Sequence, residues 1–179
     1  MSETPIRGAY LTSMGRFEDH RGVFRKIYSS DYHSLGLRGV FDVNYSENSV
    51  LGATRGLHYQ IYPYGEAKFV QCVSGSVLDF IIDLRRDSPT YGAAFSTVLS
   101  AECSNGLVVP LGCAHGYQTL SEGGSGLIYI SDQQYMKSHE ATISVFEPRV
   151  FRLLRLPPTQ LSEKDRAGLL FGKHPDPGY

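Results

Sequence analysis

The sequence predicts a single all-β domain. Its 179 residues match the roughly 100–200 residues of one domain, and no repeat or linker divides residues 1–179. The 19 Gly and 9 Pro break the chain at frequent intervals, and 12 Tyr and 9 Phe stand among many β-branched residues. Turn formers that alternate with aromatic and β-branched runs are typical of many short strands, as in sandwiches and barrels.

Nine runs of this kind are predicted to be strands. In chain order they are residues 23–28, 39–45, 68–73, 76–84, 95–99, 106–109, 117–120, 127–131 and 142–146. Two short helices are also predicted. The first spans Ser30–Leu35, because Gly36 follows it as a C-cap residue, and the second begins near Ser162, where Ser162-Glu163-Lys164-Asp165 resembles a capping box.

The two runs on either side of Ser74-Gly75 are predicted to pair as a β-hairpin, with Gly75 at the position of positive φ. Because side chains alternate along a strand, Lys68 would then lie diagonally between Asp79 and Asp83. The opposite face would be apolar and belong to the core. The residues leave two interpretations open: a solvated salt bridge, or a desolvated Lys–Asp cluster at the mouth of a barrel, which would be a candidate functional site.

Charge and hydropathy exclude several classes of partner. With 17 Lys+Arg against 18 Asp+Glu, the net charge of −1 provides no basic surface for nucleic acid. No stretch approaches the ~18 apolar residues of a membrane helix, and the N-terminal residues lack the order of a secretory signal. Three cysteines without a C-x-x-C spacing suit a reducing compartment, so a cytoplasmic location is expected.

Two of the six histidines, His58 and His115, stand in glycine-punctuated segments that are interpreted as turns where a backbone can approach a ligand. The stretch Pro110-x-Gly112-x-x-His115 is similar to half of a metal-binding cupin motif. The other half is broken at His58-Tyr59-Gln60, so no metal is expected. No motif for a nucleophilic serine, a phosphate loop or a dinucleotide is present. His, Lys, Tyr and carboxylates suit proton transfer next to a carbonyl.

An ordered set of motifs from about residue 5 to about residue 165 resembles the dTDP-4-dehydrorhamnose 3,5-epimerase family. In order, the motifs are Asp19-His20-Arg21-Gly22-Val23-Phe24, Arg55-Gly56-Leu57-His58-Tyr59-Gln60, Lys68, Asp83-Leu84-Arg85, Ser88-Pro89-Thr90-Tyr91-Gly92, Pro110-x-Gly112-x-Ala114-His115-Gly116, Tyr129 and Tyr135. The resemblance implies a jelly-roll (cupin) double-stranded β-helix, a homodimer, and neither metal nor other cofactor. It also implies a nucleotide-diphosphate 4-keto-6-deoxyhexose as substrate, in deoxysugar and polysaccharide biosynthesis.

The resemblance also implies residue roles. His58 would be the base that removes the proton α to the C4 ketone, and Tyr129 would be the acid on the opposite face of the ring. Lys68 would stabilise the C4 enolate, held in place by the predicted aspartates, Asp83 among them, and Glu147 of Glu147-Pro148 would orient His58. The substrate-binding residues would be Arg21, Phe24, Lys26, Tyr45, Arg55, Gln60, His115, Tyr135 and Glu140.

Departures from the family pattern bear on the nucleotide. The family has a carboxylate where this chain has Lys26. Where the family reads Gln-x-Asn-x-Ser-x-Ser, this chain reads Val43–Ser49, so that three polar contacts expected for nucleotide and sugar recognition have changed. A lysine only donates hydrogen bonds, so it cannot accept one from thymine, and CDP is favoured over dTDP, with GDP second.

The sequence leaves open whether the configuration is inverted at C3, at C5 or at both. The alternatives are a non-catalytic sugar-nucleotide-binding cupin, suggested by Glu147 and by the altered recognition residues, and a metal-dependent cupin enzyme.

Overall fold

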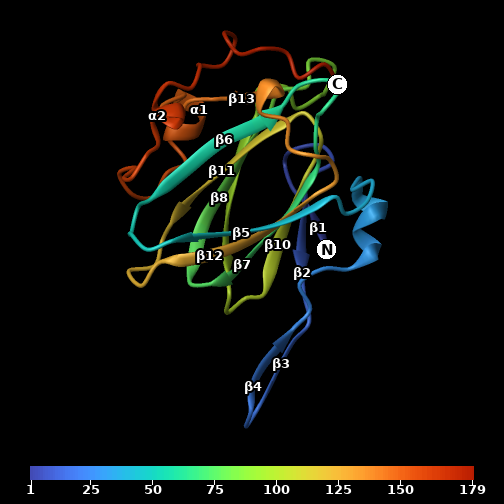
Figure 1. The fold of residues 1–179 in the computed structure, drawn as a ribbon, viewed down its shortest axis with the longest axis vertical. Helices are drawn as coiled ribbons and strands as arrows, with labels where there is room; N and C mark the ends of the chain where they lie inside the picture. The colour runs from blue at the N-terminus through green and yellow to red at the C-terminus, as the bar shows by residue number, and fades with distance from the viewer.

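Two antiparallel β-sheets face each other across the core in the computed structural model, which describes residues 1–179 (Figure 1). The larger sheet contains, in spatial order, β1 (Ser2–Glu3), β2 (Tyr10–Ser13), β10 (Asn105–Val109), β7 (Lys68–Ser74), β12 (Ser125–Ser131) and β5 (Asp42–Asn48). The smaller sheet contains β13 (Glu140–Thr142), β6 (Thr54–Gln60), β11 (Cys113–Thr119), β8 (Ser76–Asp83) and β9 (Ala94–Ser100). The order β5-β12-β7-β10 opposite β6-β11-β8-β9 is that of a jelly roll, which confirms the predicted fold class.

The remaining elements lie around this sandwich. They are the hairpin of β3 (Arg16–Asp19) and β4 (Gly22–Arg25), the 3₁₀ helices η1 (Ser30–Leu35) and η2 (Lys137–His139), and the helices α1 (Pro148–Phe151) and α2 (Glu163–Arg166). Both predicted helices are confirmed. Gly36 ends η1 with a φ of +102°, and the Ser162 hydroxyl caps α2 by accepting from the Asp165 N–H at 3.1 Å. No helix is long and apolar enough to span a membrane.

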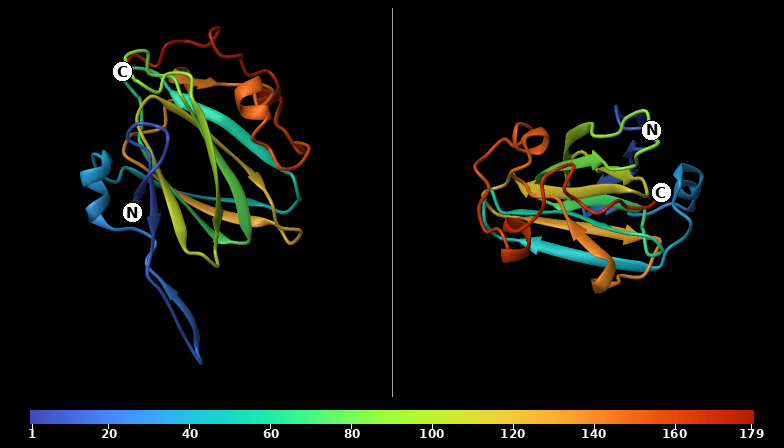
Figure 2. Two further views of the ribbon diagram at one scale, coloured as in Figure 1. Left: turned by 180° about the vertical axis from the view of Figure 1, so that it is seen from behind. Right: turned by 90° about the horizontal axis from the view of Figure 1, so that it is seen from above.

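The hairpin β3–β4 projects away from the sandwich, whereas α1, α2 and the C-terminal segment cover the outside of the smaller sheet (Figures 1 and 2). The apolar core accordingly has three parts. One lies between the sheets and includes Val70, Ile81 and Leu127. A second is outside the smaller sheet, beneath α1, and a third is outside the larger sheet, beside η1. The central strands β7, β12, β11 and β8 are therefore largely buried on both faces, whereas β5 exposes one face to solvent.

The predicted pairing of the two runs around Gly75 is wrong. β7 pairs with β10 and β12, whereas β8 pairs with β9 and β11, so Gly75 carries the chain from one sheet to the other. A Cβ on Gly75, whose φ is +66°, would lie 2.2 Å from the Gly124 carbonyl oxygen. The alternation within each strand is correct, but the predicted common apolar face is divided. Phe69 packs outside the larger sheet and Phe80 outside the smaller one.

The segments of His58 and His115 are strands rather than turns, because they form the paired central strands β6 and β11. Their glycines serve strand packing rather than approach to a ligand. A Cβ on Gly56 would lie 2.6 Å from the His115 carbonyl oxygen, and one on Gly116 would lie 2.6 Å from that of Arg55. The strand register shifts between His115 and Tyr117 at this close approach. Glycine here brings two backbones together, and the two histidines come to face the same interior.

Candidate functional site

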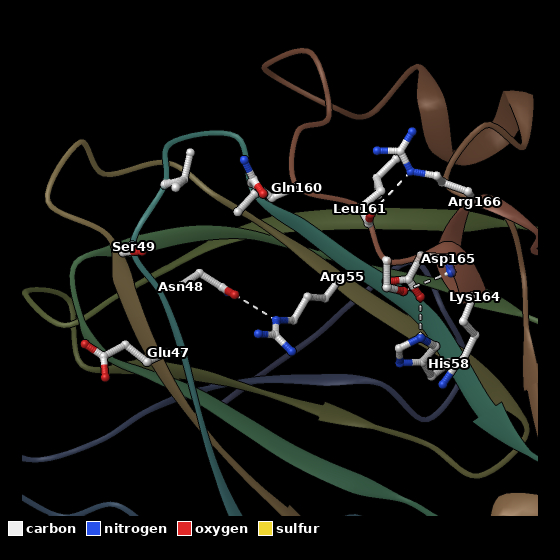
Figure 3. A pocket seen from close by; sticks show the side chains of 13 residues that line it. Glu47, Asn48, Ser49, Arg55, His58, Gln160, Leu161, Lys164, Asp165 and Arg166 are labelled. Atoms are coloured by element: carbon white, nitrogen blue, oxygen red, sulfur yellow. Dashed lines mark hydrogen bonds and ion pairs between the residues drawn. The ribbon is translucent and has the colours of Figure 1, made fainter.

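Three cavities meet at the imidazole of His58. The outer cavity, of about 670 Å³, is lined by residues of β5, β6 and the segment around α2 (Figure 3). The inner cavity, of about 270 Å³, lies between the sheets. A small cavity of about 130 Å³ connects the histidines with the opposite sheet. The inner cavity is lined by Asp42, Asn44, His58, Tyr59, Gln60, Glu66, Lys68, Tyr129, Ser131, Tyr135 and Glu140.

The two sheets provide opposite walls of this site. His58 on β6 is the register partner of His115 on β11, so both imidazoles belong to the smaller sheet. Tyr129 on β12 and Lys68 on β7 belong to the larger sheet, where β12 pairs with β7. His58, Lys68 and Tyr129 all line both the inner and the small cavity. An imidazole on one wall therefore faces a phenol and an ammonium on the other.

His58 is hydrogen-bonded to a carboxylate that the sequence analysis did not identify. Its Nε2 lies 2.6 Å from Oδ1 of Asp165, the third residue of α2, and Asp165 is only 3% exposed (Figure 3). Burial acts to raise the pKa of Asp165, but hydrogen bonds from His58, Ser162 and the Gly56 backbone hold it below its usual range. An ionised carboxylate only accepts hydrogen bonds, so Nε2 carries the hydrogen and Nδ1 is the nitrogen free to take a proton.

The expectation that Glu147 orients His58 is wrong. Glu147 is buried as the N-cap residue of α1, where one of its oxygens accepts from Arg149 and the other from the Phe171 N–H at 3.0 Å. A capping carboxylate that also holds the C-terminal segment has both oxygens engaged away from the imidazole. The proximity of a proline had suggested the wrong carboxylate.

We expect Asp165→Asn to lower kcat by about 10–100-fold with little change in KM, since an asparagine holds the imidazole less firmly in the required tautomer. The matched variant Glu147→Gln should leave kcat within about threefold and lower the melting temperature instead. Steady-state kinetics and thermal unfolding of both variants check this. The opposite ranking of the two kcat values would restore Glu147 as the partner of His58.

The predicted cluster of Lys68 with Asp79 and Asp83 is also wrong, because β7 and β8 lie in different sheets. Lys68 Nζ instead lies 2.9 Å from Oε1 of Glu66. Asp79 is fully buried and binds His115, with 2.9 Å between Oδ2 and Nε2. Asp83 accepts from Arg85 and from two hydroxyls, those of Ser88 and Thr90, and lines none of the three cavities. Asp83 is therefore a structural carboxylate, and Asp79 acts on His115.

The mouth of the inner cavity contains Tyr135 and Glu140. The Tyr135 hydroxyl donates to Glu140 Oε2 at 2.8 Å, and this bond raises the pKa of Tyr135 to about 12. The other oxygen of Glu140 accepts from Lys164 of α2. Gln60 is buried nearby, and its side-chain amide donates to the carbonyls of Tyr64 and Gln134 at 2.9 and 3.1 Å. These bonds tie the loops of the cavity mouth to β6 and α2.

Three cations line the outer cavity: Arg55, Lys164 and Arg166. Arg55 is oriented by Asn48, whose Oδ1 accepts from its Nε at 2.7 Å, so the terminal nitrogens of the guanidinium face the cavity (Figure 3). Asn48 also donates to the Tyr117 hydroxyl at 3.0 Å. A fixed guanidinium beside two further cations suits the oxygens of a phosphate or diphosphate.

Four of the expected substrate contacts lie outside these cavities. Arg21, Phe24 and Lys26 belong to the projecting hairpin or follow it. Tyr45 is 59% exposed on the outer face of β5. Side chains alternate along the strand, and its neighbours Asn44 and Ser46 are the ones that point inward. The comparison of Val43–Ser49 with the family pattern was therefore displaced by one residue.

With the register corrected, the polar positions of β5 are Asp42, Asn44, Ser46 and Asn48. Asn44 and Ser46 match the central Asn and Ser of the family pattern. One of the two arguments for a nucleotide other than dTDP is thereby removed.

The residues that the sequence analysis missed are Asp165, Glu66, Asn48 and Lys164. Asp165 and Lys164 stand inside the recognised capping box, where they were interpreted only as signals of a helix start. Glu66 stands two residues before Lys68, so strand alternation alone places it on the same side. No three His, Cys, Asp or Glu side chains among residues 1–179 come together as a metal-binding group.

The comparisons with known proteins agree over nearly the whole chain. The model of the family described as dTDP-4-dehydrorhamnose 3,5-epimerase matches residues 3–173. The enzyme of that name from Pseudomonas aeruginosa is 36% identical over 160 residues, which is 87% of this chain and 86% of the relative. A Legionella pneumophila epimerase in complex with dTDP-4-keto-L-rhamnose superposes with a TM-score of 0.83 at 30% identity, covering 93% of this chain and 89% of the other. A 3'-monoepimerase from Streptomyces bikiniensis in complex with dTDP-quinovose gives 0.85 at 27%, covering 95% and 87%.

Proposed function

This chain belongs to the dTDP-4-dehydrorhamnose 3,5-epimerase family and is a sugar-nucleotide epimerase, and we propose that it inverts a carbon next to the C4 ketone of a nucleotide-diphosphate 4-keto-6-deoxyhexose. The observation that carries the proposal is the pairing of His58 on one wall with Tyr129 and Lys68 on the other, around the same two cavities. Inversion needs a base and an acid on opposite faces of the sugar ring, and this arrangement supplies them.

In the proposed reaction, His58 Nδ1 takes the proton from the carbon next to the ketone. The electron pair of the broken C–H bond forms a C=C bond to C4, and the C4 oxygen becomes an enolate. The ammonium of Lys68 stabilises that charge from the opposite wall. The enolate then collapses to the ketone as the Tyr129 hydroxyl donates a proton to the other face of the carbon, and solvent exchanges with both groups to restore them. No electron enters or leaves, so the step balances without an oxidant or reductant.

The nucleotide part of the substrate is proposed to lie in the outer cavity. Arg55, Lys164 and Arg166 supply positive charge there, a short distance along the wall from His58, which lines all three cavities. A diphosphate bound to these cations would direct the sugar inward past His58. His115, held by Asp79, and Glu140, held by Tyr135, are proposed to contact the sugar.

A homodimer is proposed from the hairpin of β3 and β4. Phe17 and Phe24 are 65% and 70% exposed on it, and Arg21 lines none of the three cavities at His58. Exposed aromatic rings on a projecting arm are typical of a surface that a partner covers. In this proposal the arm of one copy brings Arg21 and Phe24 to the nucleotide in the outer cavity of the other.

A mixture of two inactive variants tests this arrangement. We expect Arg21→Ala and His58→Ala homodimers each to be strongly impaired, whereas co-expression should restore up to about one quarter of the wild-type activity, because half of the dimers then hold one intact site. If the arm serves its own chain, no heterodimer contains an intact site. The mixture would then be no more active than the mean of the two variants, and the crossed arrangement would be wrong.

The preferred base is a finer part of the proposal and rests on Lys26. This lysine can donate to acceptors on cytosine or guanine but cannot accept from a thymine imide, so we propose CDP first and GDP second. The names of the relatives specify dTDP. Calorimetric titration with CDP, GDP and dTDP decides between them. Equal or tighter binding of dTDP would contradict this part of the proposal and leave the epimerase reaction intact.

The decisive experiment for the reaction is NMR in deuterated water with the dTDP-, CDP- and GDP-linked 4-keto-6-deoxyglucose. We expect loss of the proton signal at C3, at C5 or at both, together with a new epimer. No exchange from any of the three substrates would favour the non-catalytic sugar-nucleotide binder. One of the two reasons that suggested that alternative has weakened, since Asp165 rather than Glu147 contacts His58.

A further inference from the structure

Glu66 is a carboxylate inside the inner cavity that the proposed reaction does not use. Its Oε1 lies 2.9 Å from Nζ of Lys68, and it is the only carboxylate within 4 Å of that ammonium. The two side chains are 10% and 12% exposed. Both line the same cavity as His58 and Tyr129. The pair therefore belongs to the reacting region and is shielded from most of the screening that weakens surface ion pairs.

Hydrogen bonds hold the backbone on both sides of Glu66 in place. The Gly65 N–H donates to the Tyr179 hydroxyl at 2.9 Å, and the Gly65 carbonyl accepts from Arg38 at 2.8 Å. The Ala67 N–H donates to Asp132 at 2.8 Å, and Ala67 packs outside the larger sheet. Because side chains alternate, this fixed Ala67 directs Glu66 and Lys68 into the cavity together.

The ammonium of Lys68 needs a partner that fixes its position. It is a point charge at the end of a flexible four-carbon stem, which loses rotamer freedom when it is fixed. A charge stabilises a developing enolate best when it is already in place, because no reorganisation is then needed during the reaction. Asp79 binds His115 and Asp83 binds Arg85, and neither carboxylate lies within 4 Å of the Lys68 ammonium.

Resting on the proposed function, we propose that Glu66 is a positioning residue of the epimerase. Its carboxylate holds the Lys68 ammonium on the wall opposite His58, ready for the oxyanion that forms at C4. The carboxylate acts through Lys68 rather than on the sugar.

A double-mutant cycle tests this role. We expect Glu66→Ala to lower kcat by about 10–50-fold while KM changes by less than about threefold, and Glu66→Gln, which keeps a neutral acceptor, to lose less. In a Lys68→Met background, Glu66→Ala should change kcat by less than about twofold, because the group it positions is gone. An equal loss in both backgrounds, or an effect on KM alone, would mean that Glu66 contacts the substrate directly, and the proposal would be wrong.

The matched control is Asp42→Asn, which removes a charge from the same cavity without touching Lys68. Its effect on kcat should be the same with Lys68 and with Met at position 68. A second measurement needs no turnover: the ¹⁵Nζ signal of Lys68, assigned by its absence in Lys68→Met. We expect an ordered ammonium in the wild type and Asp42→Asn, and a signal lost to exchange with water in Glu66→Ala.

An equally ordered Lys68 in Glu66→Ala would overturn the proposal. The two hypotheses fail separately. If Glu66→Ala releases Lys68 but the wild type exchanges no ring hydrogen of any nucleotide sugar, the proposed function is wrong while the hold of Glu66 on Lys68 stands.

Discussion

Replacement of His58 with asparagine is expected to reduce both the epimerisation and the exchange of the substrate's ring hydrogen by about 10²–10⁴-fold, the usual contribution of a general base. The reason is geometric. His58 is the one imidazole that lines all three cavities, and Asp165 holds its Nε2 so that Nδ1 is free. Asparagine keeps part of the polar contact with Asp165 but takes no proton at neutral pH.

The measurement is proton NMR in deuterated water with the substrate found for the wild type. The matched control is His33→Asn on η1, where the imidazole binds the Tyr28 hydroxyl at 2.7 Å and lines none of the three cavities. Its rate should stay within about twofold of the wild type. Undiminished hydrogen exchange in His58→Asn would remove His58 from the reaction.

Replacement of Tyr129 with phenylalanine is expected to separate the two halves of the reaction. Formation of the inverted sugar should fall by about 10²–10⁴-fold, because no group remains to protonate the opposite face. Hydrogen exchange should fall much less, since His58 still removes a proton and returns one on its own side. Burial raises the pKa of Tyr129, so the phenol holds its proton at neutral pH and is lost as an acid only above its usual range.

The matched control for this prediction is Tyr45→Phe. The resemblance assigned Tyr45 to the substrate, but it lies on the outer face of β5, so removal of its hydroxyl should leave both rates within about twofold. If Tyr129→Phe forms the epimer as fast as the wild type, the acid of the second step is water or another residue. A comparable loss in Tyr45→Phe would show that the outer face of β5 takes part in the site.

Much of the fold follows from local patterns in the sequence. All nine predicted runs overlap a strand, the last of them only at Thr142, and Gly36 and Ser162 end or begin helices as predicted. β6 was missed although it carries His58. Its sequence Thr54–Gln60 lacks the alternation of a half-exposed strand, because it is covered on both faces, and Gly56 gave the segment the character of a turn.

The catalytic candidates His58, Tyr129 and Lys68 were predicted from their motifs, and strand alternation places Lys68 and Tyr129 inside the sandwich. The partners of these residues were not predicted. Glu147 and Asp165 are both close to helix starts, and only the path of the C-terminal segment brings Asp165 to His58. Strand alternation is compatible with either Asp79 or Glu66 as the partner of Lys68. Only the assignment of β7 and β8 to different sheets selects Glu66.

By itself, the sequence determined that this chain forms short strands, which side chains share a strand face, and which chemistry its histidine, tyrosine and lysine supply. Those properties depend on neighbours one to four residues apart, which the chain order specifies. The tertiary structure alone decided which strands adjoin, which carboxylate meets which cation, and that the hairpin carrying Arg21 lies away from the cavities at His58 of its own chain. Contacts of that kind join residues as far apart as His58 and Asp165, 107 positions along the chain, and they depend on how the two sheets pack.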